Sequence, residues 1–159
     1  MNKLKFYNIN DDYIEYLYGF DKRVPNNKNS KRPYIGIIIE IDANIYFAPL
    51  FSHKQKHLRL KKNLTFIKIE NDLGIIKLNN MIPVNKESLR YINFNRLNDK
   101  KYKQLLIKQN KFIQRNSQII REKAIKLYNK TIANKNNYYN EICCDFKLLE
   151  EACKKYSED

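Results

Sequence analysis

The hydrophobic residues follow two different spacings along the chain, and this change of period is the strongest constraint on the fold. Up to residue 97, apolar residues form short β-branched runs between polar turns, such as the run from Tyr34 to Ile41, which is typical of strands. From residue 98 onward they recur every three or four residues, which is typical of helices. The sequence therefore predicts an α+β fold, with an antiparallel sheet packed by helices.

The same patterns predict individual elements. Strands are expected at residues 4–8, 34–41, 45–50, 65–69 and 74–78, with a hairpin turn at 42–44. Asn10 is expected to cap a short helix through Tyr13 and Leu17. Two longer helices are expected at 102–113 and 119–127. Asp145 is expected to cap a last helix with Leu148, Leu149, Ala152 and Cys153 facing inward.

The length and the residue types of the chain indicate one intracellular domain. At 159 residues and 43% hydrophobic, with no long linker, residues 1–159 are expected to form a single domain, strand-rich over 1–97 and helix-rich over 98–159. No apolar stretch reaches the ~18 residues of a spanning helix, and no signal peptide precedes the first strand. The three cysteines form neither a disulfide framework nor a metal-binding spacing. We therefore expect a cytoplasmic protein that does not bind membranes.

Positive charge is both large and clustered. The chain has 31 Lys and Arg against 17 Asp and Glu, a formal net charge of +14. An AT-rich genome would raise the lysine content, but it would not cluster the lysines in particular segments of the sequence. Residues 51–68 hold six basic residues and no acid, residues 100–135 hold eleven against one, and the last nineteen hold six acids against three lysines. Such a divided field attracts a polyanion, and nucleic acid is the expected partner.

Two classes of site are excluded by the residues available. The three glycines lie far apart, so a glycine-rich phosphate loop is absent. His53 and His57 are four residues apart, but Lys54 and Lys56 beside them disfavour a divalent metal. Any chemistry is therefore expected to need neither a metal ion nor another cofactor.

The segment from Ala48 to His57 carries the sharpest chemical signal. It follows a strand with one hydroxyl, two imidazoles and two ammonium groups. RNA contains its own nucleophile, the 2′-OH, so a metal-free nuclease needs only an acid, a base and cations for the charge on the phosphorane. Ser52, His53, Lys54 and His57 supply such groups. The residues alone favour a solvated basic loop that only touches phosphate, which leaves open a non-catalytic RNA-binding regulator or a DNA-binding protein.

Blocks of sequence in a fixed order resemble the ToxN/AbiQ family, including its CptN branch. These are endoribonuclease toxins of type III toxin–antitoxin systems. The segment Ala48–Lys54 is similar to the family's Ala-Pro-Leu-x-Ser-x-Lys stretch. The other blocks, which together span nearly the whole chain, are Tyr13–Leu17, Phe20–Pro25, Arg32–Ile37, Gly74–Pro83, Tyr102–Asn116 and Phe146–Glu151.

The resemblance implies a fold, an activity and a partner. The fold would be a compact relative of the Kid/MazF toxins with a strongly twisted antiparallel sheet. The activity would be metal-independent cleavage of cellular or phage RNA, leaving a 2′,3′-cyclic phosphate and a 5′-hydroxyl. A small antitoxin RNA pseudoknot, cut by the toxin from a repetitive precursor, would inhibit it in a closed toxin–RNA hetero-oligomer. The biological role would be growth arrest and abortive defence against phage.

The resemblance also assigns roles to residues. Tyr13, Ser52 and Lys54 fall on the family's catalytic positions. Because an unperturbed lysine is a poor base at neutral pH, we expect Lys54 to act as an electrostatic stabiliser or an acid. Phe51 and His53 replace a Thr and a Pro of a well-known relative, which removes a hydroxyl and adds an imidazole that can act as acid or base or stack on a base. The expected RNA-binding residues are Arg23, Lys31, Arg32, His53, Lys56, His57, Arg59, Lys61, Lys101, Lys108, Lys111 and Arg115.

Overall fold

The computed structural model describes residues 3–59, 63–133 and 138–156, apart from the side chains of residues 58 and 59. Within these ranges eight strands form one sheet in which the strand pairs are antiparallel. The strands are β1 (Lys5–Ile9), β2 (Tyr34–Gly36), β3 (Glu40–Ile41), β4 (Asn44–Phe51), β5 (Phe66–Ile69), β6 (Gly74–Lys77), β7 (Ile82–Pro83) and β8 (Leu89–Tyr91). The predicted α+β architecture is confirmed.

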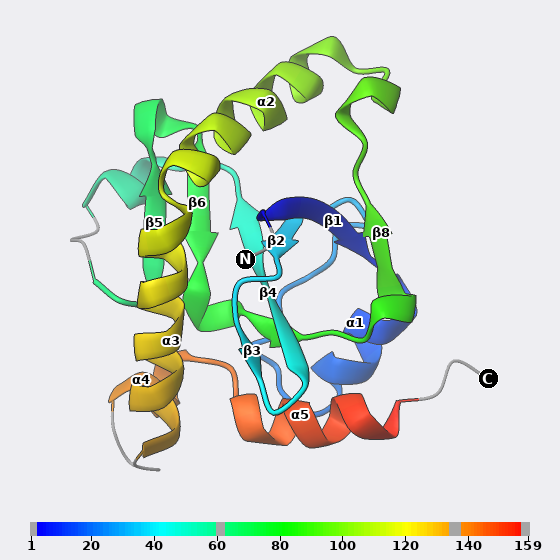
Figure 1. Cartoon of the computed structure of the whole chain (residues 1–159), viewed down its shortest axis with the longest axis vertical. Coiled ribbons are helices and arrows are strands. Elements are labelled where there is room, and N and C mark those ends of the chain that lie inside the picture. The colour runs from blue at the N-terminus through cyan, green and yellow to red at the C-terminus, as the bar shows by residue number, and fades with distance from the viewer. Residues whose placement is uncertain (1–2, 60–62, 134–137, 157–159) are drawn as a thin grey trace.

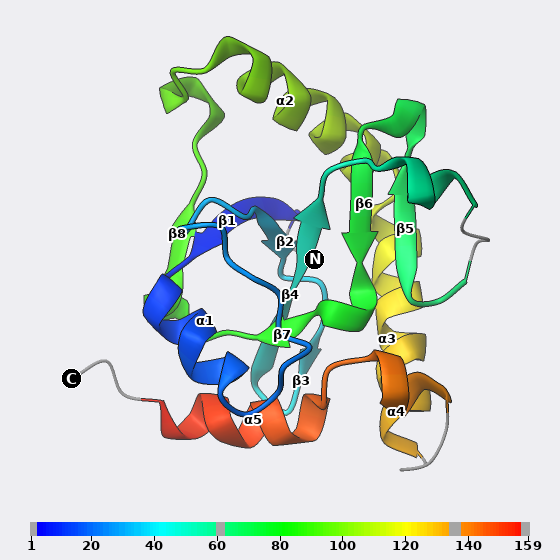
Figure 2. The same cartoon turned by 180° about the vertical axis from the view of Figure 1, so that it is seen from behind.

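Strand β4 is the centre of the sheet. The strand order is β5-β6-β4-β2-β1-β8, and β3 and β7 also pair with β4. All of its residues except the last, Phe51, are buried, so it must be almost entirely apolar, as the sequence from Ile45 to Leu50 is. Figures 1 and 2 show β4 running through the middle of the molecule, with its C-terminal end pointing toward helix α2 (Lys100–Arg115).

The strand predicted at residues 34–41 is interrupted in the structure. Tyr34 pairs with Pro49, whereas Glu40 pairs with Ile45, so six steps along one strand match only four along the other. The two extra residues form a bulge between β2 and β3. Hydrogen bonds continue across it, because the Ile38 N–H donates to the Tyr46 carbonyl oxygen at 2.9 Å. The prediction of one continuous strand is therefore wrong, although the hairpin to β4 is confirmed.

Five α-helices lie within the described ranges, on the outside of the sheet (Figures 1 and 2). Helix α3 runs beside β5, and the Lys123 ammonium group donates to the Phe66 carbonyl oxygen at 3.3 Å. None of them combines the length and apolar character that a membrane crossing requires. The helices are α1 (Asp11–Tyr18), α2 (Lys100–Arg115), α3 (Ser117–Ala133), α4 (Tyr138–Ile142) and α5 (Phe146–Lys155).

Both predicted helix starts are confirmed, since Asn10 precedes α1 and Asp145 precedes α5, but only Asp145 makes a capping hydrogen bond with its side chain. Asp145 caps α5, because its side chain accepts a hydrogen bond from the Leu148 N–H at 3.2 Å. Asn10 stands before α1 but makes no such capping bond; its side-chain oxygen accepts from Arg90 at 2.8 Å instead. Leu148, predicted to face inward, is 40% exposed. The buried face of α5 is rotated toward Phe146, Leu149 and Ala152.

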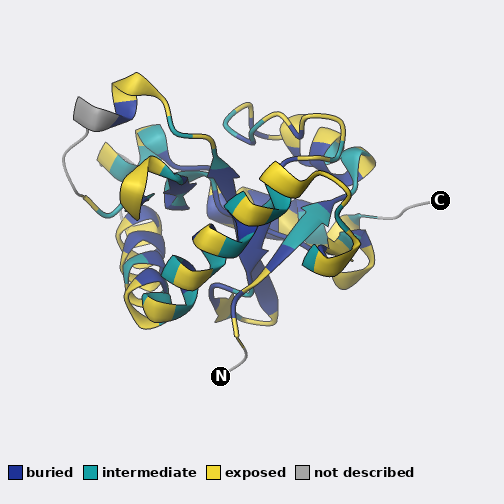
Figure 3. Cartoon of the chain, turned by 90° about the horizontal axis from the view of Figure 1, so that it is seen from above, coloured by how far each residue is buried: buried dark blue, intermediate teal, exposed yellow. Residues whose placement is uncertain are grey.

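One continuous hydrophobic core joins the strands to the helices. It extends from Leu4 in the first strand region to Ala152 in α5. Figure 3 shows the strands mostly buried, whereas on helix α2 exposed residues alternate with intermediate ones, the arrangement that a 3.6-residue period produces.

A buried carboxylate fastens α5 to the sheet and to α3. The side chain of Glu150 is only 4% exposed. Its Oε2 atom accepts hydrogen bonds from the Tyr46 hydroxyl of β4 at 2.5 Å and from the Tyr128 hydroxyl of α3 at 2.6 Å. A buried polar group is tolerated only when it is hydrogen-bonded, so these three side chains form a unit.

We expect the substitution Tyr46→Phe to lower the free energy of unfolding by about 1–3 kcal/mol, because it removes one of the two tyrosine hydroxyls that satisfy the buried carboxylate. Chemical denaturation monitored by circular dichroism measures this change. The exposed Tyr138 provides the control, and Tyr138→Phe should shift stability by less than about 0.5 kcal/mol. Equal effects of the two substitutions would contradict the proposed unit.

Candidate active site

The C-terminal end of β4 opens into a groove. After the half-buried Phe51, Ser52 is exposed and lies on the groove wall. The groove has a volume of about 760 Å³. Arg32 and Lys31 line it on the side of β2, and Tyr102 lines it from α2. The predicted serine is thus presented to a space large enough for part of a nucleotide chain.

The residues after Ser52 form a tight turn that fixes Lys54. The Lys54 N–H donates to Nδ1 of His57 at 3.1 Å, and the His57 N–H donates to the Lys54 carbonyl oxygen at 2.8 Å. Because Nδ1 accepts a hydrogen bond, it carries no proton, and the proton of the neutral ring is on Nε2. His57 is only 3% exposed. It therefore positions the Lys54 backbone and does not present a free imidazole to RNA, contrary to its predicted RNA-binding role.

Four cationic side chains gather around this turn: Arg32, Lys54, Lys56 and Lys77, which we call the cation cluster. Burial lowers the pKa of Lys77, and the neighbouring charges of Lys56, Lys54 and Arg32 lower it further. Burial also lowers the pKa of His57, with added repulsion from Lys77, Lys56, His53 and Lys54. The cluster is a site of concentrated positive potential beside Ser52.

Lys77 is the member of the cation cluster that the sequence prediction missed. It is the last residue of β6, and it reaches the cluster because Phe51 pairs with Ile75 and Leu50 with Ile76. In the sequence it stands in an apolar run that predicts a strand and nothing more. A lysine within an apolar strand was the one sign of a function, but the sequence does not show that this strand pairs with the end of β4.

Phe51 contacts two members of the cation cluster. The Arg32 guanidinium carbon lies 4.0 Å from the centre of its ring, and the Lys77 ammonium nitrogen lies 4.2 Å from it. Both distances are within the range of a cation–π interaction. The ring of Phe51 is therefore a contact surface for these two cations.

His53 lies at the edge of the same turn. Its Nδ1 atom is 3.8 Å from a carboxylate oxygen of Asp72, and its ring centre is 6.1 Å from that of His57. The side chain is about one quarter exposed, so its imidazole remains within reach of a bound RNA. Lys56 is also exposed. The structure thus brings Ser52, His53, Lys54 and Lys56 together, as predicted.

Tyr13 does not belong to this group. It is fully buried in α1, and its hydroxyl donates to the Pro83 carbonyl oxygen of β7 at 2.5 Å. Burial raises its pKa above the ordinary range. Its ring packs against Tyr16 and Tyr156. The acceptor Pro83 pairs with Tyr46, six residues before Ser52, so the predicted catalytic role of Tyr13 does not fit its position.

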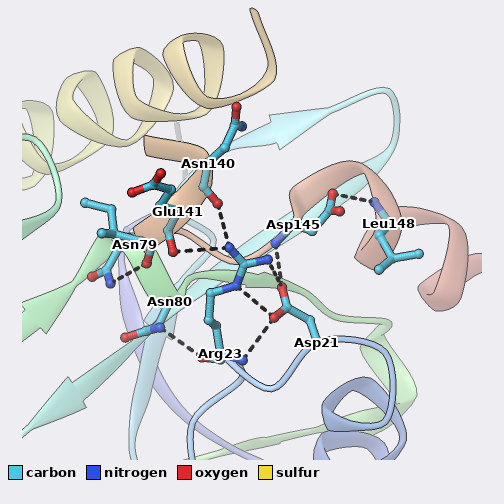
Figure 4. Close-up of polar contacts among 9 residues, drawn as sticks. Asp21, Arg23, Asn79, Asn80, Asn140, Glu141, Asp145 and Leu148 are labelled. Atoms are coloured by element: carbon cyan, nitrogen blue, oxygen red, sulfur yellow. Dashed lines mark hydrogen bonds and ion pairs between the residues drawn. The ribbon is translucent and has the colours of Figure 1, made fainter. Parts of the chain in front are cut away.

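The guanidinium group of Arg23 is engaged in contacts within the protein. Its guanidinium pairs with Asp21 at 2.9 Å and donates to the Asn140 carbonyl oxygen at 2.6 Å. Asp21 also accepts from the Asp145 N–H at 2.6 Å. Figure 4 shows Arg23 and Asp21 facing each other beneath the α4–α5 connection. This network ties the loop after α1 to the C-terminal helices, which differs from the predicted RNA-binding role.

Arg32 is likewise more enclosed than predicted. It is only 5% exposed, and its guanidinium donates to the carbonyl oxygens of Asn26 at 2.7 Å and Leu50 at 3.2 Å. It also lies over the Phe51 ring and lines the groove. Lys31 is exposed beside it. The predicted side chains of Arg59 and Lys61 lie outside the part of the chain that the structure describes.

The predicted basic residues of α2 form one exposed stripe. Lys101, Lys108, Lys111 and Arg115 are all exposed, and their intervals of seven, three and four residues align side chains along one side of a helix. Arg115 pairs with Glu70 of the loop before β6. The side of α2 that carries Tyr102 and Gln109 faces the groove. Helix α2 therefore separates a basic surface from the groove at Ser52.

The arrangement suits charge stabilisation on a phosphate. Among the described residues no three His, Cys, Asp or Glu side chains are grouped as metal ligands, and the cation cluster would repel a divalent ion. A hydroxyl, an imidazole and several ammonium groups at the edge of a groove can bind a phosphodiester, transfer protons and offset developing negative charge.

Comparison with known proteins places the chain in a family. The model of the family described as toxin ToxN, type III toxin–antitoxin system, matches residues 5–154. Endoribonuclease ToxN of Pectobacterium atrosepticum is 35% identical over 98% of this chain and 95% of its own length. Endoribonuclease AbiQ of Lactococcus lactis subsp. lactis is 32% identical over 98% of this chain and 90% of its own length.

Solved structures agree with this placement. One solved structure is that of a type III toxin that a non-coding RNA pseudoknot selectively inhibits. It matches this chain with a TM-score of 0.88 and 31% identity, and the match covers 99% of this chain and 100% of that chain. A second solved structure comes from a bacterial antiviral system that a processed non-coding RNA regulates. It matches this chain with a TM-score of 0.87 and 35% identity, and the match covers 97% of this chain and 99% of that chain. Similarity of this extent in both sequence and structure shows that the chain belongs to the ToxN family of type III toxin–antitoxin toxins.

Proposed function

We propose that this chain acts as a single-domain, metal-independent endoribonuclease toxin in the cytoplasm. The observation that carries the proposal is the cation cluster beside Ser52 at the mouth of the groove. The relatives at 32–35% identity are named endoribonucleases. The free thiols of Cys143, Cys144 and Cys153 are consistent with a reducing compartment.

The reaction is an in-line attack of the RNA 2′-OH on the adjacent phosphorus. The new O2′–P bond forms as the P–O5′ bond breaks, and the products are a 2′,3′-cyclic phosphate and a 5′-hydroxyl. Ser52 hydrogen-bonds the phosphate, and Lys54 offsets the negative charge that gathers on its oxygens. His57, neutral and buried, holds the Lys54 backbone in place. His53 is close enough to the surface to exchange a proton with the reacting groups.

The second part of the proposal concerns inhibition. In one solved relative a non-coding RNA pseudoknot selectively inhibits the toxin. We propose that an RNA of this kind, cut from its precursor by this toxin, binds the exposed stripe of α2 in a closed toxin–RNA assembly. The stripe offers positive charge, which suits a folded RNA recognised through its phosphates. Release of the toxin would then arrest growth and limit phage.

Replacing either Ser52 or Lys54 with Ala is expected to abolish RNA cleavage while antitoxin RNA binding is retained, because each substitution removes a contact to the reacting phosphate only. Cleavage by the wild type in EDTA, followed by analysis of the 3′ ends, measures both the activity and its metal independence.

The exposed Lys86 provides the control, because it follows β7, which pairs with β4 at Tyr46 and Phe47 and not at the Ser52 end. Lys86→Ala should cut normally. If both Ser52→Ala and Lys54→Ala cut RNA as fast as the wild type, the assignment of the active site to these residues is wrong. A wild-type protein that binds RNA and leaves it uncut would instead be a regulator.

The buried His57 predicts a pH dependence of stability. Its pKa in the folded protein lies below its ordinary value of 6.5, so as the pH falls the unfolded chain binds the proton first. Stability should therefore decrease as the pH falls below about 6.5 toward the folded pKa. The substitution His57→Asn keeps an acceptor for the Lys54 N–H and cannot titrate. Denaturation curves of the two proteins should diverge below pH about 6.5, and parallel curves would contradict the assignment.

The basic stripe predicts a change in salt dependence. Replacing Lys101, Lys108 and Lys111 with Gln should weaken binding of the antitoxin RNA and reduce the slope of log K against log salt by about two to three, because each lost phosphate contact releases about one counterion fewer. Fluorescence anisotropy at several salt concentrations measures the slope. A control with Lys22, Lys86 and Lys155 replaced by Gln has the same net charge, and an equal loss of slope there would contradict a specific role for the stripe.

A further inference from the structure

Lys77 occupies an electrostatically unfavourable place in the folded protein. Its side chain is half-buried at the end of β6. Three positively charged neighbours, Lys56, Lys54 and Arg32, surround it. Among the described residues, no carboxylate forms an ion pair with its ammonium group. Like charges held together without a counter-ion destabilise the folded chain, so such an arrangement is typical of a site that binds an anion.

The register of the sheet places Lys77 beside the residues that handle the phosphate. Side chains two residues apart on a strand lie on the same face. Phe51 pairs with Ile75, so Lys77 belongs to the face that carries Phe51. Ser52 follows Phe51 directly after the end of β4, and Lys54 is an electrostatic neighbour of Lys77. An anion held by Ser52 and Lys54 is therefore close to the Lys77 ammonium group.

The ring of Phe51 restricts where that ammonium group can go. The Lys77 nitrogen lies 4.2 Å from the ring centre, and the Arg32 guanidinium carbon lies 4.0 Å from it. A cation over an aromatic face gains roughly 0.5–2 kcal/mol, depending on its exposure to water. This attraction offsets part of the repulsion between the two cations and orders a lysine side chain that would otherwise sample many rotamers.

We propose that Lys77 is a further catalytic residue that binds the scissile phosphate, and that Phe51 is a positioning residue that holds the Lys77 ammonium group for this contact. The inference rests on the proposed endoribonuclease function and extends its site from the β4 turn to β6.

The test compares Lys77→Met, Lys77→Arg, Phe51→Leu and the double variant Lys77→Met with Phe51→Leu. Each variant is assayed as the full chain on a short single-stranded RNA, and kcat and KM are determined separately. Lys77→Met is expected to lower kcat by about 10- to 100-fold with a smaller change in KM, because the charge is needed most when negative charge develops on the phosphate. Lys77→Arg should restore most of the loss.

Phe51→Leu should lower kcat by a smaller factor, and the double variant should be little worse than Lys77→Met alone. This non-additivity is the signature of a residue that acts through another. If the two single effects multiply in the double variant, Phe51 acts independently and its positioning role is overturned. If Lys77→Met keeps the wild-type kcat, the catalytic role of Lys77 is overturned.

A stability measurement separates a catalytic role from a structural one. Lys77→Met removes a like charge from the cation cluster, so its Tm should equal or exceed that of the wild type while kcat falls. A lower Tm, with kcat reduced only in proportion to the unfolded fraction, would assign Lys77 a structural role and overturn the inference.

The chain provides a matched control. The Lys22 ammonium group also lies 4.2 Å from an aromatic ring, that of Tyr18, at the end of α1 and away from the groove. Lys22→Met should leave kcat unchanged, and a loss equal to that of Lys77→Met would overturn the inference. If the wild type itself cuts no RNA, the proposed function fails. If the wild type cuts RNA and Lys77→Met cuts it equally fast, only the proposed role of Lys77 fails.

Discussion

Strand β4 pairs with four other strands, β2, β3, β6 and β7, and its burial fixes how each pairing is aligned. A slip of one residue along any of these pairs would turn apolar side chains from the core to the solvent. The register that buries β4 also sets the position of everything at its C-terminal end. Ser52 reaches the groove, and Lys77 reaches Phe51, because Leu50 is opposite Ile76. The site is thus a consequence of core packing.

Two buried or half-buried polar groups differ in how they are balanced. Glu150 lies among hydroxyl groups that satisfy it, and it fastens three elements together. Lys77 has an aromatic ring and other cations around it. The first arrangement is complete within the protein. The second is completed by an anion, which is why stability and activity are expected to pull in opposite directions there.

Much of the fold follows from periodicity, whereas the site depends on pairings that periodicity does not encode. Strands around Phe47 and Ile67 and helices around Leu106 and Leu127 are where their patterns predict. The bulge after β2 was missed because an apolar run gives no sign of two unmatched residues. Ser52 and Lys54 could be proposed as site residues from local sequence order alone. The burial of Tyr13 was not expected, because the position of a residue in a motif does not show how deeply its side chain is buried. Lys77 was missed because it comes from another strand.

Helix α2 presents its basic stripe on one side and the wall of the groove on another. An α-helix with its side chains is about 10–12 Å across, roughly the spacing of two nucleotides along an extended strand. An RNA resting on the stripe would therefore overhang the entrance at Ser52 without any movement of the protein. Obstruction of the entrance alone would suffice for inhibition, and the toxin would be active again as soon as the RNA left.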